Sequence, residues 1–479
     1  MSQTRILSHS VLLAAVAFSI GGCSIAPPSA ANAPDAQVSA ANLAAHDLGD
    51  ADLGRMLETL GVPATAGAGV LTPGVVVGAA LFFRADTKLA AADIAIARAA
   101  LDAARELPNP VLSLGPEFVA NAAAVPWVIA IAAALPIDTA DKRGRRAEIA
   151  DLGLQQAVLN ASAILWQTRS RALAELQNLH DLENEAALLT EESEILDRTV
   201  AQLGKQQAAG LIGAPDVMGG RAALAQCESR RADVDARTGI ARQTLAAAMG
   251  MPGVAVAGRA VQWPELAAVP ALDPVRLDDL QTDAILNRMD LRMDLLAYAR
   301  AQAQLRLELA KQMPNLTLGP GYTYDEGEHK IVMGLSLELP LFNRNEAAIA
   351  GAEARRSKAA ATFTGTQAGI IAAVSSARAA LDGSLAAWAK ATAALEELRR
   401  ARERTQAQLR GDVANRLDVL HTQLAEVQQR QVTLDVARQI HVAMAAMEDA
   451  VQAPIWSPEL RLESALPPVA AMEMRGRQK

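Results

Sequence analysis

Residues 330–340 alternate strictly between two kinds of side chain, and this alternation constrains what the chain can form. One face is apolar and consists of Ile331, Met333, Leu335, Leu337 and Leu339. The other face is more polar and consists of Val332, Gly334, Ser336 and Glu338. A period of two predicts a β-strand with one apolar side. Residues 315–324 predict a second strand, and the acidic run from Asp325 to Glu328 supplies the turn.

This predicted hairpin has the dimensions of a membrane element. Each strand is about ten residues long, which is enough to cross a bilayer at a tilt. A lone hairpin in lipid leaves the backbone groups at its edges unpaired, so more strands must complete it, from this chain or from copies of it.

The chain contains a second hairpin of the same kind. Residues 107–116 read LPNPVLSLGP, and residues 313–320 read MPNLTLGP. Leu135-Pro136 and Leu339-Pro340 then follow their Gly-Pro pairs at the same spacing. The motif recurs roughly 200 residues apart, which indicates an internal duplication. We expect hairpins over 110–136 and 315–340.

Long helices are predicted after each hairpin. Residues 143–209 contain no proline, and their second half carries a coiled-coil seam: Leu182, Ala186, Leu189, Ser193, Leu196, Val200 and Leu203. A return helix, capped by Asp216, ends near Met249. The second half repeats the plan with helices over 283–311, 346–410 and 414–451. At 1.5 Å per residue the two shorter helices together match the longest, so we expect stacked pairs alongside each long helix.

These motifs resemble the TolC family of outer-membrane efflux proteins. The resemblance rests on P-N-x-x-L…G-P, on GLSLELPLFNRN and the following AAIAGAEARR, and on Arg288-Met289-Asp290-Leu291, which is similar to an R-P-D-L element. It covers most of the mature chain. It implies a mainly α protein with a small transmembrane β-barrel, in which three chains contribute four strands each above a tunnel of long antiparallel helices.

The amino terminus reads as a secretory signal over residues 1–22, with Arg5 as its only charge. It ends in Ile20-Gly21-Gly22-Cys23, similar to a lipoprotein cleavage box, so Cys23 is the predicted site of lipidation and palmitate attachment. A plain signal peptide with a fortuitous cysteine is the alternative. Ser24 follows, which by family analogy directs a lipoprotein to the outer membrane.

The predicted organisation places less regular segments around the two repeats. Residues 23–85 form a tether and an equatorial lead-in, with 24–54 irregular and 65–83 extended; a transmembrane helix over 65–83 is the alternative, opposed by four glycines and Pro73. The first repeat spans 86–249, a connector 250–278, and the second repeat 279–451. Residues 452–479 are predicted to form an equatorial and disordered carboxy-terminal tail.

No motif for catalysis is present. The six histidines form no i,i+4 pair and no HExxH, and neither a Walker loop nor G-x-S-x-G occurs. We predict that the chain is not an enzyme and needs no cofactor and no metal. His180 is interpreted as a solvated helix residue, and His329 as part of a hydrated turn rather than a weak cation site. Cys227 is interpreted as an inert packing residue. Without a basic block, nucleic acid is not expected as a partner.

The candidate functional positions are the two helix-hairpin tips. Glycine ends one helix and aspartate caps the next, which alone explains both tips. In the family, these tips meet a periplasmic adaptor and constrict the tunnel. The resemblance therefore implies adaptor-contacting residues Gly210, Leu211, Asp216, Gly411, Val413 and Asp418. The periplasmic gate candidates are Asp412, Arg416 and Asp418.

The leading hypothesis is the outer-membrane channel of a tripartite efflux system. Its partners would be an inner-membrane pump of the resistance-nodulation-division type, a periplasmic adaptor, outer-membrane lipid and two further copies of the chain. The motifs look most like the heavy-metal and cation branch. A type I secretion duct for polypeptides is one alternative. The adaptor itself is another, although an adaptor is expected to have one helical hairpin rather than this duplication.

Overall fold

The computed structural model describes residues 33–62, 69–120, 125–263, 266 and 274–455. The chain divides into two units, residues 1–45 and 46–479. The first contains α2 (Ala36–Ala44), whose first backbone amides are capped by the Asp35 carboxylate. Cys23 and the signal sequence lie outside the described residues.

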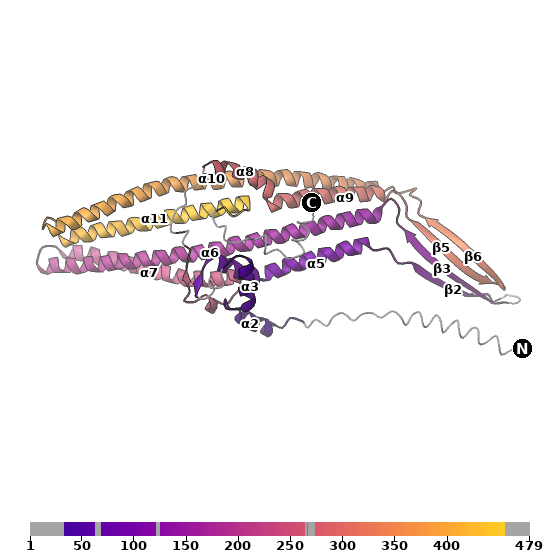
Figure 1. Ribbon diagram of the computed structural model, residues 1–479, viewed down its shortest axis with the longest axis horizontal. Coiled ribbons are helices and arrows are strands. Elements are labelled where there is room, and N and C mark those ends of the chain that lie inside the picture. Colours follow the sequence, from indigo (N-terminus) through magenta and orange to yellow (C-terminus); the bar gives the residue numbers. More distant parts are fainter. Residues whose placement is uncertain (1–32, 63–68, 121–124, 264–265, 267–273, 456–479) are drawn as a thin grey trace. The chain divides into compact units, whose positions relative to one another are not determined.

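The second unit contains two copies of one arrangement, a helix, a β-hairpin, a long helix and a return helix (Figure 1). The first copy is α5 (Ala85–Arg105), β2 (Val111–Phe118), β3 (Trp127–Ile137), α6 (Lys142–Ala208) and α7 (Ala214–Met249). The second copy is α9 (Met289–Ala310), β5 (Leu316–Asp325), β6 (Glu328–Leu337), α10 (Glu346–Arg410) and α11 (Arg416–Val451).

The short helices lie along the long ones as stacked pairs. Helices α5 and α7 pack along α6, and α9 and α11 pack along α10 (Figure 1). Helices α9 and α11 also contact α6, which joins the two copies. The predicted stacking is therefore present within the chain.

An arginine joins the two members of each stacked pair. Arg84, just before α5, donates to the carbonyls of Ala247 and Ala248 at the end of α7, both at 3.4 Å. Arg288, just before α9, donates to the carbonyl of Ala450 at the end of α11 at 3.0 Å. A guanidinium is favourable there because unpaired carbonyls and the helix dipole make a C-terminus negative.

The prediction of one helix over 283–311 is wrong. Arg288 has an extended backbone (φ −60°, ψ 128°) and separates α8 (Pro274–Asn287) from α9. Asp290 holds the Arg288 guanidinium, with Nε–Oδ1 at 3.0 Å. The break in the helix lets the Arg288 guanidinium reach both Asp290 and the Ala450 carbonyl. Local helix propensity does not predict this break.

The predictions for the segment before α5 are also partly wrong. Residues 24–54 include α2 and the start of α3 (Ala51–Thr59), both capped by aspartate. The extended lead-in over 65–83 contains β1 (Val70–Leu71) and α4 (Pro73–Phe83), whose cap is Thr72. Strand β1 pairs in parallel with β4 (Ala260–Val261), just after the 3₁₀ turn η2 (Gly253–Ala255).

Helix α4 is apolar all round because it is enclosed by protein. Val75, Val76 and Val77 are fully buried, and α4 packs on α3, α6 and α7. Its glycines give room for neighbours, since a Cβ on Gly74 would lie 2.8 Å from Val62 Cγ2. Eleven residues reach about 16 Å, too short for a hydrocarbon core of about 30 Å.

One helix among the described residues, α10, is long and apolar enough to cross a membrane by length and composition alone. A single such helix is weak evidence for a span. Its alanines suit close packing against α9 and α11 equally well.

Candidate membrane sheet and helix tips

The two hairpins form one antiparallel sheet in the order β2-β3-β5-β6 (Figure 1). The hairpins meet where β3 pairs with β5, so that Ile131 lies opposite Tyr322 and Leu135 opposite Leu318. A two-residue turn joins β5 and β6, with positive φ at Glu326 (48°) and Gly327 (93°), as a type I′ turn requires.

The register gathers apolar residues onto one face of this sheet. Because paired residues in an antiparallel sheet share a face, the pairing assigns every strand position to a side. The apolar face comprises Leu112, Leu114, Pro116, Phe118, Trp127, Ile129, Ile131, Ala133, Leu135, Ile137, Leu316, Leu318, Pro320, Tyr322, Tyr324, Ile331, Met333, Leu335 and Leu337, together with His329 opposite Tyr324. Ile331 and Met333 are 87% and 70% exposed, far more than a soluble sheet tolerates over a contiguous surface.

The opposite face is mainly small and polar, and Val111, Val128, Val332 and Pro136 also lie on it. Its members include Ser113, Gly115, Glu117, Ala130, Ala132, Thr317, Gly319, Gly321, Thr323, Lys330, Gly334 and Ser336. The second strand of the first hairpin, which looks apolar on both sides in sequence, contributes mainly alanines here. Such a sheet suits lipid on one side and water on the other.

Aromatic side chains cluster at the end of the apolar face remote from the helices. The rings of Phe118 and Trp127 meet edge to face at 5.1 Å. Tyr322 Oη lies 2.5 Å from His329 Nδ1, and the Tyr324 ring is 5.4 Å from the His329 ring. Aromatic residues at one level of a membrane sheet mark a lipid–water interface. In the turn, Lys330 pairs with Asp325 at 2.8 Å.

A buried amine holds the other end of the sheet to the helices. Lys142, the first residue of α6, donates to the Met313 carbonyl and to Asn315 Oδ1, both at 2.5 Å. Thr139 Oγ1 donates to the Pro314 carbonyl at 2.7 Å. Burial lowers the pKa of the Lys142 amine, with Asp138 acting in the opposite direction. The sequence identified the Pro-Asn motif but gave no sign of its partner.

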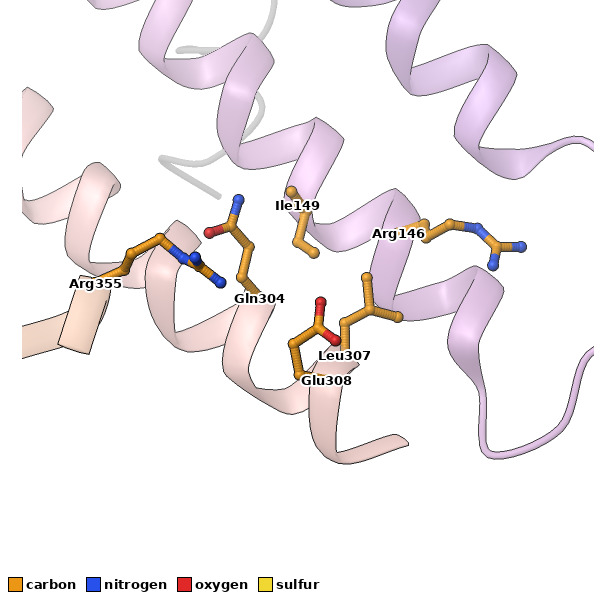
Figure 2. Close-up of a pocket in the computed structure, with 6 residues that line it drawn as sticks. All are labelled: Arg146, Ile149, Gln304, Leu307, Glu308 and Arg355. Atoms are coloured by element: carbon orange, nitrogen blue, oxygen red, sulfur yellow. The ribbon is translucent and has the colours of Figure 1, made fainter. Parts of the chain in front are cut away.

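A cleft of about 370 Å³ opens nearby between α6, α9 and α10 (Figure 2). In Figure 2, the side chain of Arg146 points away from it, and Arg146 pairs with Asp138 at 2.5 Å. Glu308 is held by Lys311 and by the side-chain amide of Asn345, both at 2.8 Å. Two of the charged side chains that line this cleft, Arg146 and Glu308, are therefore engaged within the chain.

The two tips are short turns, each followed by an aspartate in the first turn of the return helix that accepts from the N-cap amide. At the first, Gly213 is the N-cap and its amide donates to Asp216 Oδ2 at 3.2 Å, so Asp216 lies in the first turn rather than at the predicted cap position. At the second, Asn415 and Asp418 cap reciprocally at 2.9 and 3.0 Å.

The remaining tip residues are open to solvent. Gly210 and Gly411 follow the long helices, and Leu211 and Val413 are 73% and 78% exposed. Asp412 has φ 53°, and Asp412 and Arg416 are exposed. Asp418 caps its own helix, whereas the side chains of the other two gate candidates, Asp412 and Arg416, form no hydrogen bond or ion pair within the described part of the chain.

Polar contacts join α6 to α11. Trp166 and Ser170 donate to Asp449, Arg169 to Glu448, Arg438 to Glu185 and Arg430 to Glu191. Glu192, 1% exposed, accepts from Arg230 of α7 and from Gln428 and Gln431 of α11. Burial alone raises the pKa of Glu192, but hydrogen bonds from Gln431, Gln428 and Arg230 outweigh it and hold the pKa below its usual value.

A cavity of about 440 Å³ lies beside these contacts, between α6, α10 and α11. His441 lines it, is 5% exposed, and has neither ring nitrogen hydrogen-bonded within the described part of the chain. Burial lowers the pKa of His441; Asp181 opposes this shift and His180 adds to it. His180 is half-buried, bonded to Asn184 and close to Asp181, rather than solvated as predicted. Among the described residues, no three His, Cys, Asp or Glu side chains are arranged to hold a metal ion.

Comparison with known proteins shows which proteins this chain resembles. Residues 280–451 match the sequence model of the family described as "Outer membrane efflux protein". The cobalt-zinc-cadmium resistance protein CzcC of Cupriavidus metallidurans is 24% identical over 214 residues, which cover 44% of this chain and 50% of CzcC. The chain thus spans about half the length of this curated relative.

Solved structures share the fold over most of the chain. The outer membrane protein VceC of Vibrio cholerae superimposes with a TM-score of 0.64 at 18% identity, over 80% of this chain and 96% of VceC. The CmeC outer membrane channel of Campylobacter jejuni gives a TM-score of 0.64 at 15% identity, over 83% and 90% of the two chains.

Duplicated hairpins, one four-stranded sheet and paired long helices are thus a fold that this chain shares with these solved outer-membrane proteins. The chain is TolC-like in fold, and residues 280–451, which contain its second repeat, resemble the outer membrane efflux proteins in sequence.

Proposed function

We propose that this protein is the outer-membrane channel of a tripartite efflux system. The observation that carries the proposal is the sheet, whose apolar face suits lipid and whose small, polar face suits a water-filled lumen. Three copies would supply twelve strands and close the barrel, with the helices forming a periplasmic tunnel beneath it. Acyl chains on Cys23 would add a second anchor in the outer membrane.

The cargo of the proposed channel is small solutes or metal cations. The match to a cobalt-zinc-cadmium resistance protein favours the heavy-metal branch. An inner-membrane pump would choose the cargo, and a periplasmic adaptor would connect pump and channel. Export of polypeptides in type I secretion uses the same fold and is the alternative that substrate assays must separate.

The helix tips are the proposed contact with the adaptor. Leu211 and Val413 present exposed apolar side chains there, beside Gly210, Asp216, Gly411 and Asp418. In a threefold assembly Asp412 and Arg416 would form charged rings, which select ions and open when their pairing changes. Asp412→Ala is expected to raise single-channel conductance; unchanged conductance would remove Asp412 from the gate.

The function is tested first by planar-bilayer conductance of the detergent-purified mature protein, with its mass measured on the same sample. We expect a trimer with discrete openings that prefer cations. A water-soluble monomer without pores would refute the proposal.

A matched pair of cysteine variants tests the assignment of the two faces. In a Cys227→Ser background, Ser336→Cys places a thiol on the polar face and Leu335→Cys places one on the apolar face. A charged methanethiosulfonate reagent should reduce the current through the first variant and leave the second unchanged. Equal block of both, or block of the second alone, would contradict the proposed lumen.

A further inference from the structure

The cavity beside His441 is not used by the proposed channel function. Its volume is about 440 Å³, and it lies where α11 packs between α6 and α10 (Figure 1). A single water needs about 10–15 Å³ of space, whereas pockets for small molecules have about 300–1,000 Å³. The cavity therefore has the size of a ligand site rather than that of a site for one water.

The cavity is lined by regular faces of three helices. The lining residues of α11 are Arg430, Leu434, Ala437 and His441. Those of α6 include His180, Asn184, Ala187 and Glu191. Because each set repeats in steps of four and three residues, it lies along one face of its helix. Helix α10 adds Trp388 and Leu395, which are seven residues apart.

Much of the lining is apolar. Leu188 and Leu395 are each 8% exposed, and Leu434 and Trp388 complete the apolar part of the wall. Since aromatic rings pack favourably on one another, Trp388 favours a flat aromatic ligand over an aliphatic one of the same size. The apolar lining therefore selects a ligand with an aromatic body.

The charged side chains at the cavity are paired within the chain. A carboxylate oxygen of Asp181 lies 3.6 Å from Arg438 Nε, and the other lies 3.5 Å from His180 Nδ1. Glu191 accepts a hydrogen bond from Arg430 at 2.6 Å. An ionised ligand would thus lose its hydration without gaining a free counter-ion, which is unfavourable. The cavity therefore favours an uncharged ligand.

His441 is the polar group that such a ligand would meet. Its side chain is 5% exposed, and neither ring nitrogen is hydrogen-bonded within the described part of the chain. An unsatisfied buried polar group is costly, so a ligand that bonds to it is favoured. Burial lowers the pKa of His441, so at neutral pH one ring nitrogen donates and the other accepts. A hydroxyl group, which can also donate or accept, is the matching partner.

We propose that this cavity binds a small uncharged phenol, with its ring against Trp388 and the leucines and its hydroxyl group on His441. The proposal goes beyond the channel function, because it assigns a ligand site to the helices whether or not they enclose a tunnel. The bound molecule would contact α6, α10 and α11 together. Binding should therefore slow local opening of α11 beside the cavity.

Three probes of one shape test this chemistry on the unmodified protein. Naphthol, methylnaphthalene and naphthoate, substituted at the same ring position, differ only in carrying a hydroxyl, a methyl or a carboxylate group. Calorimetric titration of the detergent-purified protein, with protein-free detergent as reference, should show one naphthol bound per chain. The other two should bind about tenfold or more weakly, because one leaves His441 unsatisfied and the other brings an unpaired charge.

Hydrogen exchange then locates the bound probe. Naphthol should slow exchange of the amides of residues 433–441, and leave that of residues 220–240 in α7 unchanged. His441→Leu should bind naphthol and methylnaphthalene alike. Ala437→Phe fills the cavity and should abolish binding, whereas Ala446→Phe, at an exposed position of α11 outside the cavity, should retain it. The titrations of the unmodified protein decide the chemistry even if Ala437→Phe does not fold.

Four other results would each overturn the proposal. Equal affinity of the unmodified protein for naphthol and methylnaphthalene would show that His441 does not bond the ligand. A preference for naphthoate would show a site for anions. Undiminished binding in a folded Ala437→Phe variant would place the site elsewhere. Absence of naphthol binding would show that the cavity is a hydrated gap between helices. None of these results depends on conductance or trimer mass, so the proposed function is tested separately.

Discussion

The buried ion pair between α6 and α11 gives a prediction with a defined size. Arg169 is 2% exposed, and its Nη1 lies 3.1 Å from Glu448 Oε2. Its guanidinium also lies over the Trp166 ring, at 4.9 Å from the centroid. Glu448 in addition accepts from the Ile455 amide at 2.8 Å. Both charges are thus held in a water-poor site by several partners.

Removing one partner leaves the other charge buried without its counter-ion. We expect Arg169→Met to destabilise the end of α11 by about 3–5 kcal/mol. Since each 1.4 kcal/mol is tenfold in an equilibrium constant, local opening should become roughly 140- to 3,700-fold more frequent. Replacing both partners, in Arg169→Met/Glu448→Leu, removes the unpaired charge and should restore most of the loss.

Hydrogen exchange of the amides in residues 443–451 measures this opening directly. Purified channel in detergent is compared with the single and double variants under conditions where exchange follows the opening equilibrium. The amides of residues 370–381 in α10 serve as an internal control. Exchange in Arg169→Met within threefold of the parent, or a double variant as labile as the single, would refute the reasoning.

Three further predictions concern pH and packing. Because burial lowers the pKa of His441 below its unfolded value, folding excludes a proton, so stability should fall as pH drops below about 6.5; His441→Leu should flatten that slope in melts from pH 7.5 to 5. Lys142→Met leaves the Met313 carbonyl and the Asn315 oxygen without this donor, and should lower stability by about 1–3 kcal/mol in thermal melts. Gly78→Val would press on Leu57 and should cost about 1–3 kcal/mol, whereas Gly54→Val, which meets no atom within 4 Å, should cost under about 1.

The sequence predicted the elements that depend on local patterns. Strand β6 was foreseen because its alternation is local, and α10 has its predicted bounds because 346–410 lacks any proline. Helix α4 was missed because a helix buried on all sides has no periodicity, and its glycines and proline resemble loop signals. The helix break at Arg288 was missed because its cause is a carbonyl 162 residues away.

The candidate site likewise has features that local sequence patterns predict and features that only the fold reveals. The two faces of the sheet were partly visible in β6, but β3 was ambiguous until pairing assigned Ala130 and Ala132 to the polar side and Ala133 to the apolar side. The contacts between α6 and α11 join residues 236 to 283 positions apart, as in Gln428–Glu192 and Trp166–Asp449. No spacing rule connects such residues, so only the fold reveals them.

Joining the two hairpins in one polypeptide frees their junctions to evolve separately. In a ring of identical half-units, one substitution would change every junction alike. Here the junction after β3 contains the buried Lys142, whereas the counterpart of Lys142 after β6 is the exposed Glu346. The first junction forms during folding of a single molecule and is indifferent to protein concentration. In the proposed trimer, the junction after β6 would lie between copies, so substitutions there would change assembly without changing the junction inside the chain.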